Sequence, residues 1–377
     1  MVEWKKLVTV SDVLYGYPFE SSLFSEDSAY MPLIRIRDVK PAKASTYYKG
    51  KFNEAYRIKK GDILVGMDGE FNLGKWEDRD GLLNQRVLKL KGKDGCSIDG
   101  YLFHYMGPVF KKIEKETPGG SVKHLSAKVI NSILIPIPSI EEQTRIVGIL
   151  DTFTASIDNL KEQIAQRRKQ YEYYRDQLLD LEGKEGVEMK TLGEVFDTRN
   201  GYTPSTSNEQ FWEGGTIPWF KMEDIRDNGR ILYDSYLHIT PMAVKGKGLF
   251  KANSIILATS ATIGEHALIL VDYLCNQRFT NFFPKEKYTQ SIEMKYVYYY
   301  MFIIDEWCKQ HVNQGGFASV DMAGLYNMSF PIPSLEEQQR IVSILDTFEA
   351  SIQNLEAQLS QREKQYEYYR NKLLTFE

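Results

Sequence analysis

Apolar residues recur at alternating steps of four and three positions along two stretches of the chain. The first stretch runs from Ile146 to Leu181 and the second from Ile341 to Phe376, with the same steps throughout. An unbroken heptad stripe of this length predicts a coiled coil. About 40 helical residues at a rise of 1.5 Å per residue would form a rod of roughly 60 Å. The predicted seam consists of Ile146, Leu150, Phe153, Ile157, Leu160, Ile164, Arg167, Tyr171, Tyr174, Leu178 and Leu181, and of Ile341, Leu345, Phe348, Ile352, Leu355, Leu359, Arg362, Tyr366, Tyr369, Leu373 and Phe376.

The second stretch repeats the first. When Pro136 is aligned with Pro331, the two copies stay in step without a gap to Glu182 and Glu377, and 33 of the 47 aligned positions are identical. The rest of each half is far less alike, so the chain is predicted to read domain, helix, domain, helix. The four predicted segments are 1–138, 139–182, 183–333 and 334–377.

Both helices are predicted to begin with the same local signal. Ser139 precedes Glu142, and Ser334 precedes Glu337, which is the spacing of a capping box. In that motif the serine accepts from a first-turn amide and the glutamate reaches back to the start of the helix. Because an exposed apolar stripe of this size favours aggregation, we expect the two helices to pack on each other. We expect an antiparallel pair with pseudo-two-fold symmetry and the two domains at opposite ends.

An arginine interrupts the seam at the same layer of each copy, at Arg167 and Arg362. A polar residue in a seam often fixes the register at some cost in stability. A long basic side chain can instead extend along the apolar surface to solvent. The sequence leaves both interpretations open.

The two domains share short landmarks although their sequences diverge. Short β-branched runs within them predict buried strands, and longer apolar runs predict helices. The expected fold class is therefore α+β, with two globular α+β domains separated by the two long helices. The aligned landmarks are MPLIRIRDV (31–39) with IPWFKMEDI (217–225), KGDILVGMDGE (60–70) with ANSIILATSAT (252–262), LNQR (83–86) with CNQR (275–278), and GGSVKHL (119–125) with QGGFASV (314–320).

Composition predicts a soluble cytoplasmic protein. The chain has no apolar run of about 18 residues and no signal peptide at its start. Its three cysteines are widely spaced and predict neither a disulfide framework nor a metal site. The net charge of −4 hides an asymmetry, because residues 1–140 carry +5. A local basic surface of that kind suits a nucleic-acid partner.

The doubled motif at the end of each half resembles a known family. Each half ends in the pattern PIPSxEEQxRIVxILD, preceded by a GDI or NSI strand, an NQR triplet and a Gly-Gly pair. Together with the order of domains and helices, these residues resemble the specificity (S) subunit of type I restriction–modification systems. The resemblance covers essentially the whole chain.

The resemblance implies a function for each segment. The two domains would be target recognition domains, each reading one half of a bipartite, asymmetric sequence in double-stranded DNA. The helices would set the spacing between the half-sites and dock two methyltransferase (M) subunits, and restriction (R) subunits can join the complex. S-adenosylmethionine, ATP and Mg²⁺ would belong to those partners, so this chain is expected to carry no cofactor and no catalytic residue.

Motifs of neighbouring enzymes are absent from the sequence. It has no N/D-P-P-Y/F tetrapeptide, which an adenine methyltransferase of the resembling class would carry, and no phosphate-binding G-x-x-x-x-G-K-S/T. The histidines do not follow a metal-binding spacing. Two other classes stay as alternatives: a structural coiled-coil adaptor, and a stand-alone enzyme that modifies nucleic acid.

Candidate DNA contacts follow from the side chains that read bases and phosphates. Arginine, lysine, asparagine and glutamine read base edges, whereas lysines, arginines and hydroxyls hold the phosphate backbone. In the first domain the candidates are Arg35, Arg37, Asp68, Tyr47, Lys49, Asn84, Gln85, Arg86 and Lys123. In the second domain they are Lys221, Glu223, Thr259, Ser260, Asn276, Gln277, Arg278 and Gln314.

Some of these candidates have an equally good structural interpretation. The NQR triplet occurs in both divergent domains, so it could be a turn whose amides satisfy backbone groups. Asp38 and Asp224 are shared in the same way and could cap helices. The paired glycines of the last landmark are expected to allow a positive φ or a close approach to phosphate.

Two tyrosines of the doubled segment KQYEYYR lie off the seam, Tyr173 and Tyr368. With Val147, Ile149 and their counterparts Val342 and Ile344, they give each helix an apolar flank. We expect these flanks to pack on the adjoining domain or to dock an M subunit. Two copies of one partner would explain why the segment is doubled.

Overall fold

The computed structural model describes residues 2–117, 123–313 and 318–376. The chain forms two compact units. The first unit comprises residues 1–162 and 357–377, and the second comprises residues 163–356. Each unit therefore contains one of the two domains together with half of each long helix.

The first unit is an α+β domain whose main sheet packs against α3 on one face and against α2 on the other. This sheet has the strand order β2-β10-β7-β8, and a second sheet has the order β3-β5-β4-β9-β6. Successive residues of its strands point to opposite faces. The elements are β1 (Glu3–Lys6), α1 (Leu7–Val10), β2 (Ser11–Tyr15), β3 (Phe24–Ser25), β4 (Met31–Ile34), α2 (Ile36–Val39), β5 (Tyr47–Tyr48), β6 (Arg57–Ile58), β7 (Ile63–Gly66), β8 (Leu73–Lys75), β9 (Gly81–Leu83), β10 (Val87–Gly92), α3 (Asp99–Glu116), α4 (Ala127–Ser132) and β11 (Leu134–Ile137).

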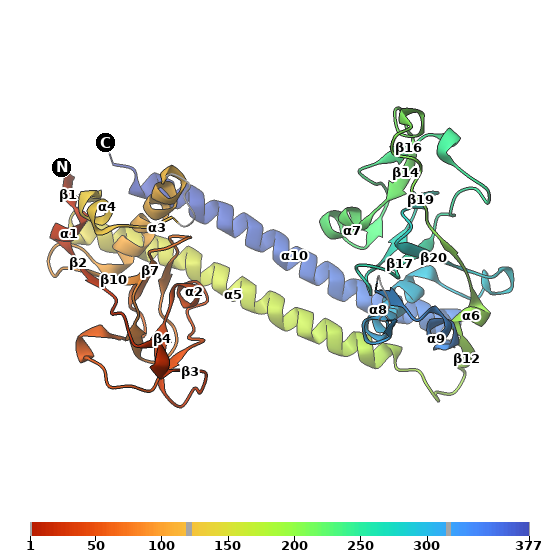
Figure 1. Ribbon diagram of the computed structural model, residues 1–377, viewed down its shortest axis with the longest axis horizontal. Coiled ribbons are helices and arrows are strands. Elements are labelled where there is room, and N and C mark those ends of the chain that lie inside the picture. The colour runs from red at the N-terminus through yellow and green to blue at the C-terminus, as the bar shows by residue number, and fades with distance from the viewer. Residues whose placement is uncertain (1, 118–122, 314–317, 377) are drawn as a thin grey trace. The chain divides into compact units, whose positions relative to one another are not determined.

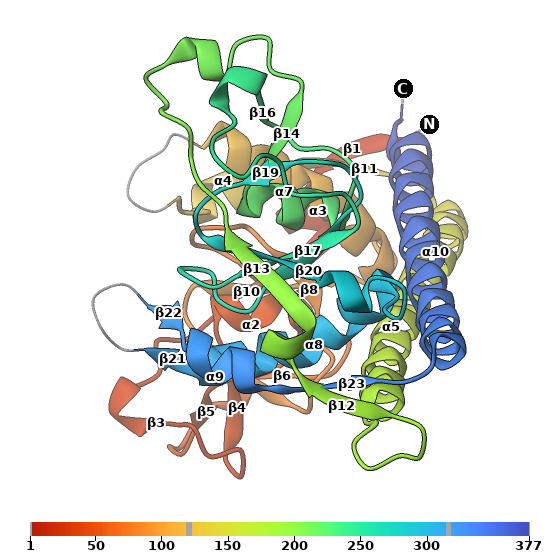
Figure 2. The ribbon, with the colours of Figure 1, turned by 90° about the vertical axis from the view of Figure 1, so that its right-hand side faces the viewer.

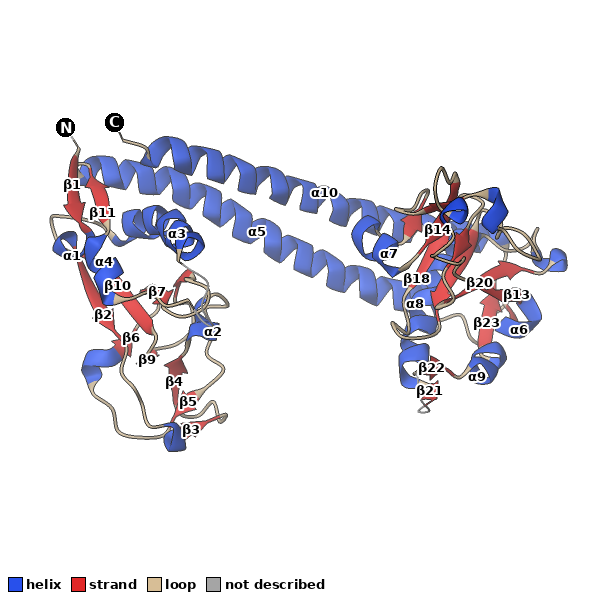
Figure 3. Cartoon of the chain, turned by 45° about the horizontal axis from the view of Figure 1, so that its top comes forward, coloured by secondary structure: helices blue, strands red, loops and turns tan. Residues whose placement is uncertain are grey.

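Helix α3 joins the main sheet to the long helix α5 (Ile140–Leu179). Leu102 and Met106 pack with Val65 and Leu88 of the sheet, all of them buried. Tyr101, on the other side of α3, packs against Ile146 and Leu150 of α5. Figure 3 shows α3 lying between these strands and α5. The domain is thus anchored directly on its own long helix.

The second unit has the same plan. Its main sheet has the order β13-β20-β17-β18-β15, and β23 follows α9 directly and pairs with β12 (Figure 2). The elements are β12 (Glu188–Thr191), α6 (Leu192–Val195), β13 (Phe196–Asn200), β14 (Ile217–Phe220), α7 (Met222–Asn228), β15 (Ile231–Leu232), β16 (His238–Ile239), β17 (Ser254–Ala258), β18 (His266–Ile269), β19 (Leu274–Cys275), β20 (Phe279–Pro284), α8 (Met294–Gln310), β21 (Val312–Asn313), β22 (Ser319–Val320), α9 (Met322–Asn327) and β23 (Ser329–Ile332).

The long helices α5 and α10 (Leu335–Leu374) pack antiparallel, as predicted (Figure 1). In the first unit Phe153 stacks on Tyr369, with ring centroids 5.3 Å apart, and in the second unit Tyr174 stacks on Phe348 at 5.4 Å. The partner's residue number falls as the number on α5 rises. The predicted α+β fold with an antiparallel coiled coil is therefore confirmed.

Part of the predicted seam is not buried. Ile146, Leu150 and their counterparts in α10 are fully buried, but the side chains of Tyr174 and Tyr369 are 46% and 41% exposed. The prediction that these two tyrosines belong to the core is wrong, because each ring lies flat on a phenylalanine at the rim of the seam. The guanidinium of Arg362 lies 5.7 Å from the Phe153 ring centre, so the seam arginine is packed on a ring.

The doubled motif fixes the start of each long helix. The Ser139 hydroxyl accepts from the Glu142 amide at 3.2 Å, and Ser334 does the same for Glu337. The predicted serine caps are therefore confirmed. The glutamate does not complete the box as expected, because the Glu142 carboxylate pairs with Arg145 at 2.6 and 2.7 Å, one turn along the helix.

The glutamine of the same motif binds each long helix to its domain. Gln143 is fully buried; its Nε2 donates to the carbonyls of Cys96 and Pro138, and its Oε1 accepts from the Ile98 amide. Gln338 makes the same three hydrogen bonds in the second unit. One side chain thus satisfies backbone groups at the start of both the long helix and the helix before it.

Polar contacts between helix and domain differ between the units. In the first unit His104 Nδ1 lies 2.9 Å from the Tyr366 hydroxyl and its Nε2 lies 2.8 Å from Asp151 Oδ1. Burial lowers the pKa of His104 more than Asp151 raises it. In the second unit the Tyr299 hydroxyl donates to Asp346 instead, at 2.5 Å.

Candidate nucleic-acid interface

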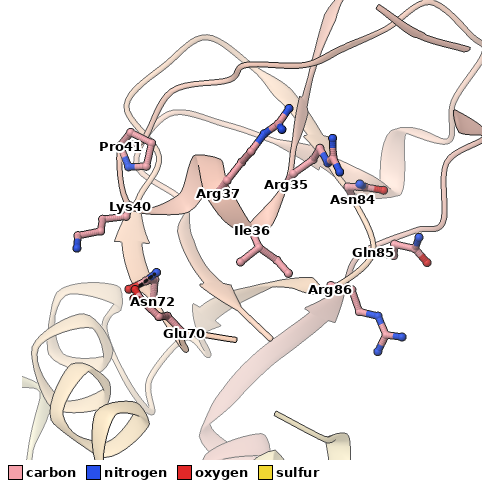
Figure 4. A pocket seen from close by; sticks show the side chains of 10 residues that line it. All are labelled: Arg35, Ile36, Arg37, Lys40, Pro41, Glu70, Asn72, Asn84, Gln85 and Arg86. Atoms are coloured by element: carbon pink, nitrogen blue, oxygen red, sulfur yellow. Dashed lines mark hydrogen bonds between the residues drawn. The ribbon is translucent and has the colours of Figure 1, made fainter. Parts of the chain in front are cut away.

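A hollow of about 560 Å³ opens on the first domain (Figure 4). Five of the predicted DNA contacts line it, although they come from two separate segments of the chain. Arg35 and Arg37 come from the start of α2, and the other three come from the turn between β9 and β10. The lining residues are Arg35, Ile36, Arg37, Lys40, Pro41, Glu70, Asn72, Asn84, Gln85 and Arg86.

Parallel strand pairing brings these two segments together. Strands β4 and β9 are parallel, with Leu33 opposite Leu82 and Ile34 opposite Leu83. Two parallel strands end at the same edge of a sheet, so Arg35, which follows β4, lies near the turn that follows β9. Strands β14 and β19 of the second domain are also parallel, which places Lys221 and Asn276 at the corresponding edge.

A buried aspartate shapes the segment after β4. Asp38 is 1% exposed, and its carboxylate accepts from the Arg35 amide at 2.9 Å. In the second domain Asp224 accepts from the Lys221 amide at 2.8 Å and is also buried. The structural interpretation of these two aspartates as caps is confirmed.

The NQR triplet is a tight turn with one inward and two outward side chains. The carbonyl of Asn84 accepts from the Val87 amide at 3.2 Å, and Asn276 repeats this bond with the Phe279 amide. The side chain of Asn84 is 6% exposed, whereas Gln85 and Arg86 are exposed. The structural interpretation holds for the backbone turn and for Asn276, whose Oδ1 accepts from the Arg278 amide at 3.0 Å. Within the described residues Asn84 Oδ1 is buried without a hydrogen-bond partner, so the interpretation fails for that amide. Gln85 and Arg86 point outward.

Glycines make room for both turns. A Cβ on Gly16 would lie 1.9 Å from the carbonyl oxygen of Asn84, and a Cβ on Gly201 would lie 2.3 Å from that of Asn276. Arg86 itself has a φ of 71°, a value that non-glycine residues seldom adopt. The backbone thus holds this arginine in a defined place at the rim of the hollow.

Asp68 and His124 orient the side chain of Arg86. Asp68 Oδ2 lies 3.3 Å from Arg86 Nε, and Asp68 Oδ1 lies 2.5 Å from His124 Nδ1. In the second domain Ser260 stands at the position of Asp68 and Ser319 at that of His124, and a backbone bridge joins the two serines. That domain therefore lacks both the carboxylate and the imidazole. The two domains therefore present differently supported arginines.

The remaining candidates of the first domain are placed as follows. Arg37 donates to the hydroxyls of Ser45 and Thr46, which holds its side chain against the segment that precedes β5. Tyr47 is half-buried beneath Arg79, and Lys49 is exposed. Lys123 Nζ donates to the carbonyl of Glu114. Tyr48, which lies between Tyr47 and Lys49 in the sequence, is buried in the core and cannot contact DNA.

In the second domain the candidates are spread along the equivalent edge. Lys221 Nζ lies 4.0 Å from Glu223 Oε2. The Thr259 hydroxyl lies 2.9 Å from the Thr280 hydroxyl. Gln277 Oε1 accepts from the Thr203 hydroxyl at 2.5 Å. Arg278 is exposed. Gln314 and the glycine pairs at 119–120 and 315–316 lie outside the described residues.

Sequence reasoning missed His124 and the buried cluster of His266, Asp305 and Arg230. Asp305 Oδ2 lies 2.7 Å from His266 Nδ1 and 2.9 Å from Arg230 Nη1. Burial lowers the pKa of His266, and Arg230 and Asp305 form an ion pair beside it. It ties β18 to α8 and has a structural role. His124 could have been found as the polar residue that follows the Gly-Gly landmark.

Two other features of the described residues bear on function. Across 2–117, 123–313 and 318–376, no group of three or more His, Cys, Asp and Glu side chains is placed to hold a metal ion. Among the helices of that same part of the chain, none has the length and hydropathy needed to cross a membrane.

Known proteins resemble this chain in both sequence and fold. A family model described as "Type I restriction modification DNA specificity domain" matches residues 1–167 and 184–363. The chain therefore belongs to the family of type I restriction–modification DNA specificity proteins. Its similarity to individual members is high enough to align most of the chain.

The Escherichia coli EcoR124I/EcoR124II specificity subunit is 34% identical over 355 residues, which cover 88% of this chain and 85% of that protein. The E. coli EcoprrI specificity subunit is 49% identical over 214 residues, which span about half of each chain (54% and 53%). The S subunit of a type I system from M. genitalium has the same fold, with a TM-score of 0.59, 17% identity and coverage of 100% and 97%.

Proposed function

We propose that this chain is the DNA-recognition and scaffold subunit of a type I restriction–modification complex. The observation that carries the proposal is the edge at which parallel strands end in each domain. There the first domain gathers Arg35, Gln85 and Arg86 around a hollow, and the second domain presents Lys221 and Arg278 at the equivalent place. Arg35 against Lys221 and Asp68 against Ser260 differ between the domains. Different side chains at equivalent positions suit two domains that read different halves of one asymmetric target.

The long helices are proposed to set the spacing of the half-sites and to dock two M subunits. Tyr173 and Tyr368 are each 61% exposed, and each meets its neighbouring tyrosine edge to face at 5.3 Å. The same exposed aromatic pair thus occurs once per half, which suits two copies of one partner. In this proposal the methyl donor, ATP and Mg²⁺ are bound by the partners, and this chain has no catalytic residue.

Methylation mapping tests the function. Cells that express the chain with its M subunit are expected to carry one bipartite motif, with adenine methylated on both strands, because two reading domains are held by one rod. DNA from these cells would be sequenced by a single-molecule method that detects modified bases. A soluble complex that leaves DNA unmethylated would count against the proposal and favour a structural adaptor.

Replacing Tyr173 and Tyr368 together with alanine is expected to weaken capture of M subunits by about tenfold or more. Exposed aromatic side chains that become buried in an interface often dominate its binding energy. A pulldown with quantified stoichiometry measures the effect. Tyr233→Ala is the matched control, since that side chain is 67% exposed but lies in the second domain. Full stoichiometry in the double variant would remove the docking role from these tyrosines.

A further inference from the structure

The two long helices are nearly identical but carry inverted charges near their middle. Lys161 of α5 corresponds to Glu356 of α10, and Arg168 corresponds to Glu363. The seam residues on either side are the same or similar apolar types, such as Ile157 in α5 and its identical counterpart in α10. The apolar seam therefore does little to favour the pairing of α5 with α10 over the pairing of either helix with a second copy of itself.

The inverted positions pair across the seam. Lys161 Nζ lies 3.8 Å from Glu363 Oε1 in the first unit. Arg168 lies 2.5 Å from Glu356 Oε1 in the second unit. These two contacts are equivalent under the internal repeat. In both of them α5 supplies the cation and α10 supplies the carboxylate.

The repeat shows what a different pairing would bring together. If α5 packed against α5 of a second chain, Lys161 would meet Arg168 at both contacts. If α10 packed against α10, Glu356 would meet Glu363. Other contacts would survive the exchange, since Tyr366, which meets His104, has the identical residue Tyr171 as its counterpart.

We propose that these two charge pairs make α5 and α10 select each other and disfavour pairing between like helices of two chains. Charged residues that flank the seam of a coiled coil commonly set partner choice in this way. Each pair alone is weak, because the four side chains are 42–61% exposed. The discrimination arises because pairing like helices replaces both of these attractive charge contacts with repulsive ones.

A consequence follows if the proposed function holds. The first domain differs from the second, and the intrachain pair keeps one of each on every rod. A rod made from two copies of α5 would carry two first domains and would read a symmetric target. The charge pairs then protect the asymmetry of the recognised sequence.

The test uses the full chain and exchanges charges within one pair. The variant R168E/E356K keeps both intrachain pairs attractive and keeps the net charge, but it makes each helix complementary to its own copy. K161E/E363K does the same with the other pair. The matched control K161E/R168E/E356K/E363R also keeps both intrachain pairs and the net charge, yet like helices still repel each other.

Each variant is co-expressed as two copies with different tags. Dimers that contain both tags are isolated by two successive affinity captures, one for each tag. We expect the mixed dimer to rise roughly 10-fold or more in R168E/E356K and K161E/E363K over the wild type and the four-fold control. Raising the salt to about 1 M should reduce the difference, because it shortens the screening length to about 3 Å. Melting temperatures close to the wild-type value show that each variant folds.

Equal amounts of mixed dimer in the two-fold variants and the four-fold control would overturn the proposal. A wild-type chain that already forms as much mixed dimer as R168E/E356K would do the same. Neither readout involves DNA or an M subunit, so failure here is distinct from failure of the proposed function.

Discussion

Replacing Gln143 with alanine is expected to lower the free energy of unfolding by about 2–5 kcal/mol. The substitution leaves the carbonyls of Cys96 and Pro138 and the amide of Ile98 without their partner, in a place where the glutamine is fully buried. A buried polar group that loses its hydrogen bond costs about 1–3 kcal/mol, and water that enters the cavity recovers part of this. Urea unfolding of the variant measures the loss.

The repeat supplies two controls. Gln338→Ala removes the same three hydrogen bonds from the second unit and should cost a similar amount. Gln339→Ala changes an exposed glutamine one position along and should cost less than about 0.5 kcal/mol. Hydrogen exchange should locate the weakened region at the start of α3 in the first variant and of α8 in the second. Equal stability of the Gln143 and Gln339 variants would contradict the anchoring role.

The long helices could be predicted because their signals are local in sequence. Heptad spacing and the serine caps need no knowledge of the rest of the fold, and both are confirmed. The roles of Glu142 and Gln143 could not be read in this way. The Glu142 carboxylate can bind either the amides at the helix start or Arg145. The hydrogen bonds of Gln143 depend on where α3 begins, and tertiary packing decides that position.

The exposed tyrosines show the limit of periodicity. Tyr174 and Tyr369 fall on the seam by spacing, yet both lie at its rim, because a large ring can reach a neighbouring phenylalanine without entering the core. Periodicity gives the direction in which a side chain leaves the helix. It does not give the depth of the partner surface.

The candidate site could be predicted in part because the two halves can be compared. The landmarks around Arg35 and Arg86 were visible in both domains, and the structure places them at one edge. The reason lies in the parallel pairing of β4 with β9, which short strands do not reveal in sequence. The support of Arg86 by Asp68 and His124 was also hidden, since these residues come from three separate segments.

Replacing Arg86 with alanine is expected to weaken binding to the cognate DNA by about 1–3 kcal/mol, or roughly 5–150-fold. Asp68 Oδ2 lies 3.3 Å from Nε and His124 Nδ1 lies 3.5 Å from one terminal nitrogen, so the guanidinium is held in place while 54% of the side chain stays exposed. A planar guanidinium fork held in this way is suited to hydrogen bonds with a base edge. Arg86→Lys keeps the charge but loses this fork, so it should recover little of the specificity. Competition binding with single-base variants of the mapped motif measures both effects.

The pattern of losses identifies what Arg86 contacts. A base reader should lose discrimination at one base pair of one half-site, and Arg278→Ala should act on the other half-site. A phosphate contact should instead weaken all sequences about equally and reduce the salt dependence of binding by about one ion. Asp68→Asn, which leaves Arg86 in place but weakens its support, should reduce discrimination at that same base pair by a smaller amount. Unchanged affinity and specificity in Arg86→Ala would move the reading surface of the first domain away from this hollow.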